Sequence, residues 1–231
     1  LEGLNEETVV LRGEINELIP VPMNGATYMA DLMGGQKTGL FYDQRPNHAF
    51  AAKLSKGRDV LDVFSHVGGF SLAALAGGAK SALAVDGSAP ALELAQKGAE
   101  AGGVSDKFET HKGDAFDTMI AMGKEPRRFG VVVCDPPAFA PSKQALEAGL
   151  RAYERVARLG ANLVEPGGYL VLCSCSHSAD LARFREISLR GVGKAGRRAQ
   201  IVSTGQAGPD HPTHPYLAET SYLKALFLRL D

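Results

Sequence analysis

Residues 59–71 place an apolar segment, a short polar loop and an alanine-rich apolar segment in direct succession, and this order constrains the fold more than any other feature. Residues 59–63 predict a buried strand, with Asp62 close to its end, and the residues after Gly68 predict a helix. A loop that enters a helix N-terminus offers backbone N–H groups to a ligand. The stretch therefore predicts a strand-loop-helix nucleotide site.

The loop differs from a dinucleotide-binding fingerprint. A pyrophosphate-binding Gly-x-Gly-x-x-Gly needs glycines where this chain has Phe64 and His66, so NAD is not the expected ligand. Asp86 closes the next strand-like segment, where a carboxylate accepts hydrogen bonds from ribose hydroxyls. Asp62 and Asp86 together indicate an adenosine group.

From Arg58 onward, strand-like segments alternate with helical ones, which favours a mainly parallel sheet covered on both faces. Residues 200–204 and 222–229 predict a terminal hairpin whose last strand is antiparallel. We expect an α/β, Rossmann-like, doubly wound fold with a seven-stranded sheet. Strands are expected to end near residues 63, 85, 111, 134 and 173, with helices near 68–77, 88–102, 113–122, 142–162 and 178–192.

The N-terminal part predicts a small antiparallel β appendage. Residues 8–12 and 26–32 alternate as short strands do, with proline, asparagine and glycine between them. A helix of about ten residues, ending near Gly57, is expected to follow. We therefore expect a β-hairpin region over residues 1–35 and a Rossmann-like domain over residues 36–231.

Composition narrows the class of protein. A chain of 231 residues that is 45% apolar can bury the core of one domain with a modest appendage. It shows neither a long apolar run nor a charged leader, so a cytoplasmic protein without a membrane span is expected. Cys134, Cys173 and Cys175 lack the spacing of a zinc site or disulfide framework, which predicts reduced thiols and no metal. A net charge of −1 argues against RNA, unless a segment missing before Leu1 carries charge.

Ligands of open α/β sheets bind beyond the carboxyl ends of the strands. Asp114 follows the third expected strand, where it accepts a hydrogen bond from an exocyclic adenine amine or caps the next helix. Asp135 follows the fourth, and Pro136 and Pro137 make a stiff turn that holds its carboxylate and Phe139 over the site. The alternative for this turn is an ordinary proline-rich strand exit.

Two cysteines end the fifth expected strand. Cys173 is expected to pack in the sheet as a small buried hydrophobe. Cys175 falls past the strand end, where it is a nucleophile if its thiolate is stabilised, or an inert buried thiol. His177 either polarises the site or caps the next helix, and the sequence leaves both open.

These motifs resemble the class I S-adenosylmethionine-dependent methyltransferases. More narrowly, they are similar to the bacterial large-subunit ribosomal RNA cytosine-5 methyltransferases with an N-terminal PUA domain, a domain expected to be absent here. His66-Val67 stands where that family usually has Tyr-Thr, and Gly98 where Asn is common. The matching pieces are residues 35–45, 61–70, 86–88, 135–139, 173–177 and 210–212.

The resemblance implies S-adenosylmethionine as cofactor and RNA, expected to be 23S rRNA, as partner. The oligomeric state is left open between a monomer and a homodimer. It implies that Cys175 attacks C6 of an unstacked cytosine while Asp135 contacts the N3/N4 edge. It leaves the base that removes the C5 proton unassigned. Cofactor contacts are expected from Asp62, Phe64, Ser65, Gly68, Asp86, Asp114, Ala115, Asp135 and Pro136. Substrate contacts are expected from Gln44, Arg45, Pro137, Phe139 and His177.

Several alternatives stay open at this point. The methyl acceptor could be another RNA base, a small molecule or a protein, because fold does not fix function. A non-enzymatic RNA-binding module that keeps the cofactor site is the third hypothesis. Arg45 could pair locally with Asp43, and residues 210–212 could form a structural turn or cover the crevice. The basic run from Arg183 to Arg198 favours a solvated helix face over RNA backbone contact.

Overall fold

The computed structural model describes residues 10–15, 17–34 and 39–231. Within these residues, seven strands form one sheet and two more form a hairpin. The hairpin strands are β1 (Ile19–Met23) and β2 (Ala26–Ala30), and the sheet strands are β3 (Asp59–Val63), β4 (Ser81–Asp86), β5 (Phe108–Lys112), β6 (Phe129–Cys134), β7 (Val164–Ser174), β8 (Ala199–Gly205) and β9 (Lys224–Leu230). The α-helices are α1 (Arg45–Leu54), α2 (Gly69–Ala76), α3 (Ala89–Ala101), α4 (Ala115–Gly123), α5 (Leu146–Leu163) and α6 (Leu181–Lys194). Short 3-10 turns are η1 (Tyr42–Gln44), η2 (Ser105–Lys107) and η3 (Ala218–Thr220).

The sheet confirms the expected doubly wound α/β fold. Its strand order is β5-β4-β3-β6-β7-β9-β8, and β9 is antiparallel to both of its neighbours. The other neighbouring pairs are parallel. The chain winds outward from β3 to β5 and then returns to β6, so the winding direction reverses between β3 and β6. This reversal is where open α/β sheets form a ligand crevice.

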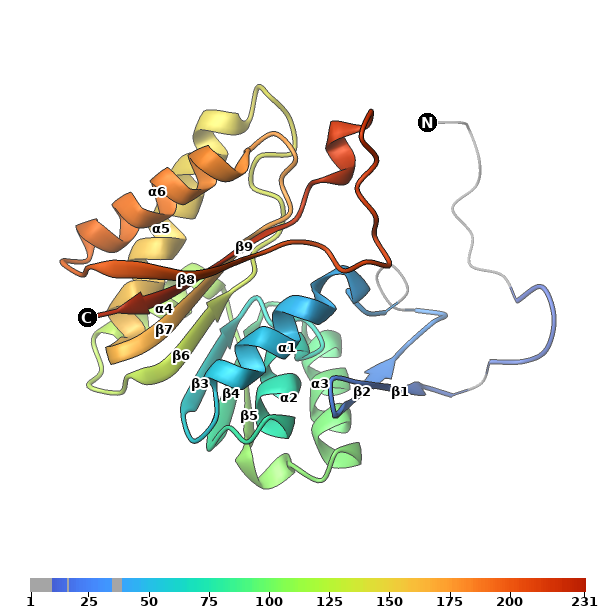
Figure 1. Cartoon of the computed structure of the whole chain (residues 1–231). Coiled ribbons are helices and arrows are strands. Elements are labelled where there is room, and N and C mark those ends of the chain that lie inside the picture. The colour runs from blue at the N-terminus through green and yellow to red at the C-terminus, as the bar shows by residue number, and fades with distance from the viewer. Residues whose placement is uncertain (1–9, 16, 35–38) are drawn as a thin grey trace.

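The core lies on both faces of the sheet because alternate strand residues point to opposite sides. Leu61 and Val132 pack toward the layer of α4, α5 and α6, whereas Val60 and Val131 pack toward α1, α2 and α3. Figure 1 shows the two helical layers with the sheet between them. In the described part of the chain, no helix is both long and apolar enough to cross a membrane.

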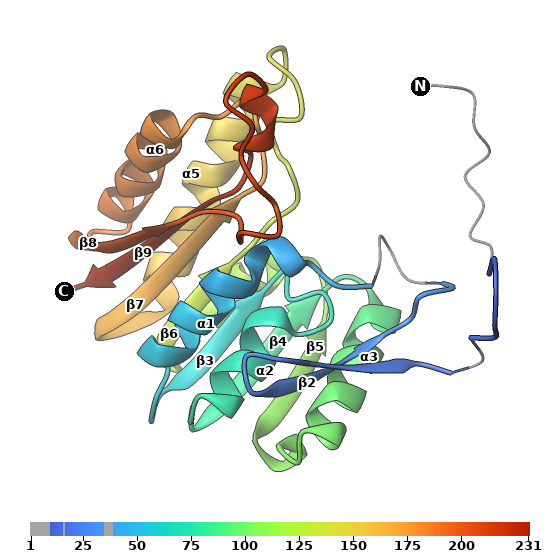
Figure 2. The ribbon, with the colours of Figure 1, turned by 45° about the vertical axis from the view of Figure 1, so that its right-hand side comes forward.

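The β1–β2 hairpin packs against α2 and α3, as Figure 2 shows. Its turn is Asn24-Gly25, and both residues have positive φ (54° and 78°), as the tight turns of two-residue hairpins require. Tyr28 of β2 is fully buried and its hydroxyl donates to the Gly69 carbonyl over 2.9 Å. The hairpin is thereby fastened to the start of α2.

The pairing within this hairpin differs from the expected one. Of the first expected strand, residues 8 and 9 lie outside the described residues, and residues 10–12 form a bend and no strand. The Asn-Gly turn instead pairs β2 with the residues just before the turn, which include Pro20 and Pro22. Proline is tolerated there because β1 is an edge strand, whose outward positions need no donor.

Candidate active site

A cavity of about 420 Å³ opens at the carboxyl ends of the strands, around the reversal between β3 and β6. It is lined by residues that follow five strands, β3 to β7, and by η1. The predicted site residues that line it are Gln44, Phe64, Asp86, Asp114, Ala115, Asp135, Pro136, Pro137 and Cys175. The same edge of the sheet therefore gathers three carboxylates and a thiol into one space.

The loop after β3 keeps a glycine-like backbone without the glycines. Phe64 has φ of 64° and His66 has φ of 50°, a left-handed conformation that is costly for bulky residues. The Phe64 ring makes edge contacts with Phe116 and Phe139, with ring centroids 6.3 Å apart in each pair. The loop therefore differs from the dinucleotide-binding fingerprint in its side chains, while Phe64 and His66 keep the positive φ that glycine favours. Backbone strain of this kind is typical of functional loops.

Asp62 lies beneath this loop and does not line the cavity. It is fully buried in β3, and its Oδ2 accepts hydrogen bonds from the Ser71 amide (2.9 Å) and hydroxyl (2.5 Å). Its Oδ1 has no hydrogen-bond partner among the described residues. Burial raises the pKa of Asp62 to about 6. Gly68, at the N-cap of α2, also lies outside the cavity lining.

Asp86 and Asp114 line the cavity and also brace the backbone. Asp86 accepts from the amides of His66 and Ser88, each over 2.8 Å. Asp114 is the N-cap of α4, where its Oδ1 accepts from the Asp117 amide over 3.0 Å. The helix-capping alternative for Asp114 is therefore confirmed, and its place in the cavity wall is compatible with a ligand contact as well.

A smaller hollow of about 30 Å³ adjoins the cavity and shares Phe41, Phe64 and Asp135 with it. His48 and Ser65 line this hollow and are 3% and 5% exposed. Neither His48 Nδ1 nor Ser65 Oγ has a hydrogen-bond partner in the described part of the chain. Burial lowers the pKa of His48 to about 3, which keeps its imidazole neutral. Buried polar atoms of this kind call for a partner, which a water molecule or a polar ligand group in the hollow would supply.

Asp135 lies between the cavity and the hollow, and Gln44 holds it there. Gln44 Nε2 donates to Asp135 Oδ2 over 2.9 Å, while Gln44 Oε1 accepts from Asn47 Nδ2 over 2.6 Å. The Asp135 amide donates to the Val63 carbonyl over 3.2 Å. The Asp135 backbone is thus fixed at the β3 exit, and its carboxylate is held by Gln44 of η1, which Asn47 of α1 orients.

Cys175 is the first residue after β7 and is partly exposed in the cavity wall. Cys134 and Cys173 are buried in the sheet, where desolvation raises the pKa of both thiols. The prediction that Cys173 packs in the sheet is confirmed. Of the three thiols, Cys175 alone lines the cavity, and Asp135, which directly follows the neighbouring strand β6, lines the same cavity.

The segment between β8 and β9 closes one side of the cavity by docking on η1 and α1. The Tyr222 hydroxyl donates to Asp43 Oδ2 over 2.7 Å, and Arg45 Nη2 lies 3.3 Å from Asp210 Oδ2. These contacts replace the local Asp43–Arg45 pair weighed from the sequence, and Arg45 does not line the cavity. Asp43 and Tyr222 also line the cavity, and neither is among the site residues predicted from the sequence. Asp43 could have been predicted from the sequence, because it is adjacent to the predicted site residue Gln44.

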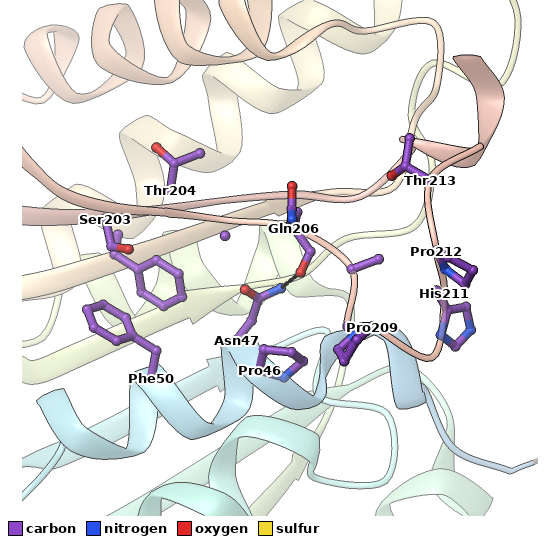
Figure 3. A pocket seen from close by; sticks show the side chains of 14 residues that line it. Pro46, Asn47, Phe50, Ser203, Thr204, Gln206, Pro209, His211, Pro212 and Thr213 are labelled. Atoms are coloured by element: carbon purple, nitrogen blue, oxygen red, sulfur yellow. Dashed lines mark hydrogen bonds between the residues drawn. The ribbon is translucent and has the colours of Figure 1, made fainter. Parts of the chain in front are cut away.

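A second, more open groove of about 650 Å³ lies where this segment meets α1 (Figure 3). Asn47 donates to the Gln206 carbonyl over 3.3 Å across it, and Pro46 and Phe50 form its α1 side. Within the described lining there is neither a carboxylate nor a thiol. The groove therefore has fewer reactive groups than the smaller cavity.

Phe139 and His177 do not line the cavity. Phe139 packs between Phe116 and Tyr153, with ring centroids 6.1 and 5.0 Å away. His177 is exposed beside Ser178, and the α6 N-cap is Asp180. Among its alternatives, capping of α6 is thus excluded for His177.

Four of the six side chains of the basic run make recorded contacts within the protein. Arg190 and Lys194 both pair with Glu154 of α5, and Arg183 lies 3.6 Å from Glu147. Arg197 donates to the Ala161 and Val164 carbonyls and pairs with Asp231. These contacts favour the helix-face interpretation over an RNA-binding patch.

Comparison with known families gives a match over nearly the whole chain. The model of a family described as S-adenosylmethionine-dependent methyltransferase matches residues 5–229. A protein of Aeromonas salmonicida named Ribosomal RNA large subunit methyltransferase I is 37% identical over 99% of this chain and 58% of its own length. A Vibrio cholerae protein of the same name is 38% identical over 96% of this chain and 57% of its own length. The chain thus spans less than three-fifths of these relatives.

Solved structures show the same fold. A protein from Streptococcus mutans described as a SAM-dependent methyltransferase superimposes with a TM-score of 0.84 at 22% identity, covering 95% of this chain and 57% of its own. A tRNA m1G37 methyltransferase from M. jannaschii superimposes with a TM-score of 0.62 at 19% identity, covering 97% of this chain and 60% of its own. At these identities the likeness concerns the fold alone.

Proposed function

The chain belongs to the S-adenosylmethionine-dependent methyltransferase family, and from this premise we propose that it methylates C5 of cytosine in large-subunit ribosomal RNA. The names of the two relatives above support RNA as the acceptor. The observation that carries the choice of cytosine C5 is the shared cavity of Cys175 and Asp135. A thiol and a carboxyl group that follow neighbouring strands are the nucleophile and the general acid of this reaction.

The residues present fit the cofactor. We assign Asp86 to the ribose hydroxyls and Asp114 with Ala115 to the adenine, because these residues follow adjacent strands and line one cavity. The unpartnered polar atoms of His48 and Ser65 suit the charged amino-acid end. When bound, S-adenosylmethionine supplies an electrophilic methyl group.

The thiolate of Cys175 adds to C6 of cytosine, and the electrons of the C5–C6 double bond then make C5 nucleophilic. Asp135, held by Gln44, binds the N3/N4 edge in its protonated form and donates a proton to N3 as negative charge develops on the ring, and this proton returns to Asp135 when Cys175 leaves. After C5 has gained the methyl group, a base that the residues named above leave unassigned takes the C5 proton, the electrons of that C–H bond re-form the C5–C6 double bond, and the C6–S bond breaks to release the Cys175 thiolate. The cytosine must be unstacked to enter the cavity.

The test is transfer of labelled methyl from S-adenosylmethionine to deproteinised ribosomal RNA and to ribosomal particles, followed by nucleoside analysis. The variants are Cys175→Ala and Cys175→Ser, with Ser178→Ala of the same loop as the matched control. Label in 5-methylcytidine that depends on Cys175 and survives Ser178→Ala supports the proposal. Label in another nucleoside, or full activity of Cys175→Ser, contradicts it and favours a methyltransferase with another acceptor.

A further inference from the structure

Lys224 is a buried lysine directly beside the loop that carries Cys175. It is 6% exposed, begins β9 and pairs in register with Ser174, the last residue of β7. Its Nζ donates to the carbonyls of Ser176 and Ala179, each over 2.7 Å. The ammonium therefore lies under the turn that leads out of β7.

Burying a lysine ammonium costs free energy unless the charge is paired. Lysine is among the residues that are rarely buried without a charged partner. In the described part of the chain, no carboxylate forms an ion pair with Lys224, and its two hydrogen-bond acceptors are both backbone carbonyls. Asp180 at the α6 N-terminus and Cys175 are the anionic groups close enough to interact with its charge. The arrangement makes a Cys175 thiolate one of two counter-charges for the ammonium, beside Asp180.

We propose that Lys224 is a positioning residue for the thiol of Cys175: its ammonium fixes the loop and stabilises the thiolate. The inference rests on the proposed function only in naming Cys175 as the nucleophile. A cation beside a thiol lowers its pKa and raises the fraction present as thiolate.

In the described part of the chain, the other titratable groups recorded around Cys175 are phenols and carboxyl groups, not cations. Tyr153 and Tyr222 approach it from α5 and from the segment before β9, and burial raises the pKa of both phenols, so they stay neutral. Asp135 in the same cavity wall opposes a thiolate. Burial lowers the pKa of Lys224 to about 8, so its charge is present at neutral pH.

The loop also has an anchor that carries no charge, and this gives a matched control. Ser176 Oγ accepts from the Ala140 amide over 3.0 Å and lies 2.8 Å from the Tyr153 hydroxyl. Removing this hydroxyl loosens the loop and leaves the ammonium in place. The two effects of Lys224, geometry and charge, can therefore be separated.

The experiment measures the rate of alkylation of Cys175 by iodoacetamide from pH 6 to pH 10, read at that residue by mass spectrometry. It uses neither RNA nor cofactor, so its outcome is independent of whether the proposed methylation is correct. Cys134 and Cys173 are buried and serve as internal references. The variants are Lys224→Met, Lys224→Gln, Lys224→Arg and the control Ser176→Ala, each checked for folding by circular dichroism.

For the wild type, the pH midpoint of the Cys175 alkylation rate is expected to lie below about 8.5, the pKa of a free cysteine. Lys224→Met and Lys224→Gln are expected to raise the midpoint by about one pH unit, which is about a tenfold lower rate at pH 7. Lys224→Arg and Ser176→Ala are expected to stay near the wild-type midpoint. A wild-type midpoint at or above that of free cysteine overturns the proposal whether or not the variants fold. An unchanged midpoint without the lysine charge, or an equal shift in Ser176→Ala, overturns it too.

Discussion

Gln44 Nε2 lies 2.9 Å from Asp135 Oδ2 and joins two segments that are 91 residues apart in the sequence. The amide is itself oriented by Asn47, whose Nδ2 donates to Gln44 Oε1 over 2.6 Å. Gln44 is 2% exposed, so solvent cannot replace this contact. The direction of the Asp135 carboxylate therefore depends on the segment that precedes the sheet.

Gln44→Leu is expected to lower kcat/KM for methyl transfer about 10- to 100-fold, because a lost hydrogen bond to a charged group costs about 1.5–3 kcal/mol. Gln44→Glu is expected to lower it further, because it places a second carboxylate against Asp135. The matched control is Gln200→Leu, an exposed glutamine of β8. Steady-state kinetics with labelled methyl donor measure the effect, and wild-type kcat/KM in Gln44→Leu would remove Gln44 from the site.

The two roles of Asp114, capping of α4 and contact with the adenine, can be tested separately. Asn caps a helix as well as Asp does, yet its amide has one acceptor oxygen fewer for an adenine amine. Asp114→Asn is expected to unfold near the wild-type temperature and to bind S-adenosylhomocysteine about tenfold more weakly, for the loss of one hydrogen bond. Asp114→Ala is expected to lose about 1 kcal/mol of stability in addition.

Thermal unfolding and titration calorimetry measure the two effects on Asp114 variants. Asp180→Asn at the α6 N-cap is the control, and it should change neither quantity appreciably. Wild-type affinity in Asp114→Asn would assign this carboxylate to helix capping alone.

The fold and the strand-end residues followed from local patterns. Strand-like segments that alternate with helical segments along the chain predict a mainly parallel sheet. The carboxyl ends of parallel strands lie at one edge of the sheet, which brings Asp86, Asp114, Asp135 and Cys175 into one cavity. Asp62 carries the same strand-end signal but is turned inward to Ser71, because its position within β3 puts it on the face that α2 covers.

Contacts between distant segments could not be predicted in this way. The pairing of Tyr222 with Asp43 depends on how the segment before β9 lies on η1, and no pattern within either segment encodes it. The partner of β2 was missed because Pro20 and Pro22 are typical of turns, while the Asn24-Gly25 turn decides the pairing.

Gly98 is expected to be required by packing, although glycine weakens a helix by about 1 kcal/mol relative to alanine. A Cβ at this position of α3 would lie 3.0 Å from the Thr27 carbonyl oxygen of β2 and 2.8 Å from Leu72 Cδ1. Gly98→Ala is therefore expected to destabilise the protein by about 1–3 kcal/mol, as overpacking does. At Gly193 of α6, by contrast, a Cβ would meet no described atom within 4 Å, so Gly193→Ala should be neutral or stabilising. Urea unfolding compares the two, and a gain in stability from Gly98→Ala would contradict the packing argument.

His48 is expected to make the protein sensitive to acid. Burial lowers its pKa from 6.5 to about 3, so between these pH values the unfolded chain binds a proton at His48 and the folded protein does not. A depressed pKa gives stability that is fully present above pH 6.5 and is lost as the pH falls toward 3. Between pH 7.5 and pH 5 the expected loss is about 2 kcal/mol, at 1.36 kcal/mol for each pH unit below 6.5.

The matched variant is His48→Gln, which keeps a polar side chain and cannot take up this proton. Asp62 acts in the opposite direction, because its raised pKa of about 6 adds stability as the pH falls below that value, but it does so equally in both proteins. Urea unfolding at pH 7.5, 6 and 5 should therefore show the stability difference between wild type and variant shifting by about 2 kcal/mol in favour of His48→Gln. Parallel pH profiles would mean that His48 takes up its proton at the same pKa in the folded and unfolded states, and the argument for a neutral imidazole beside the hollow would then fail.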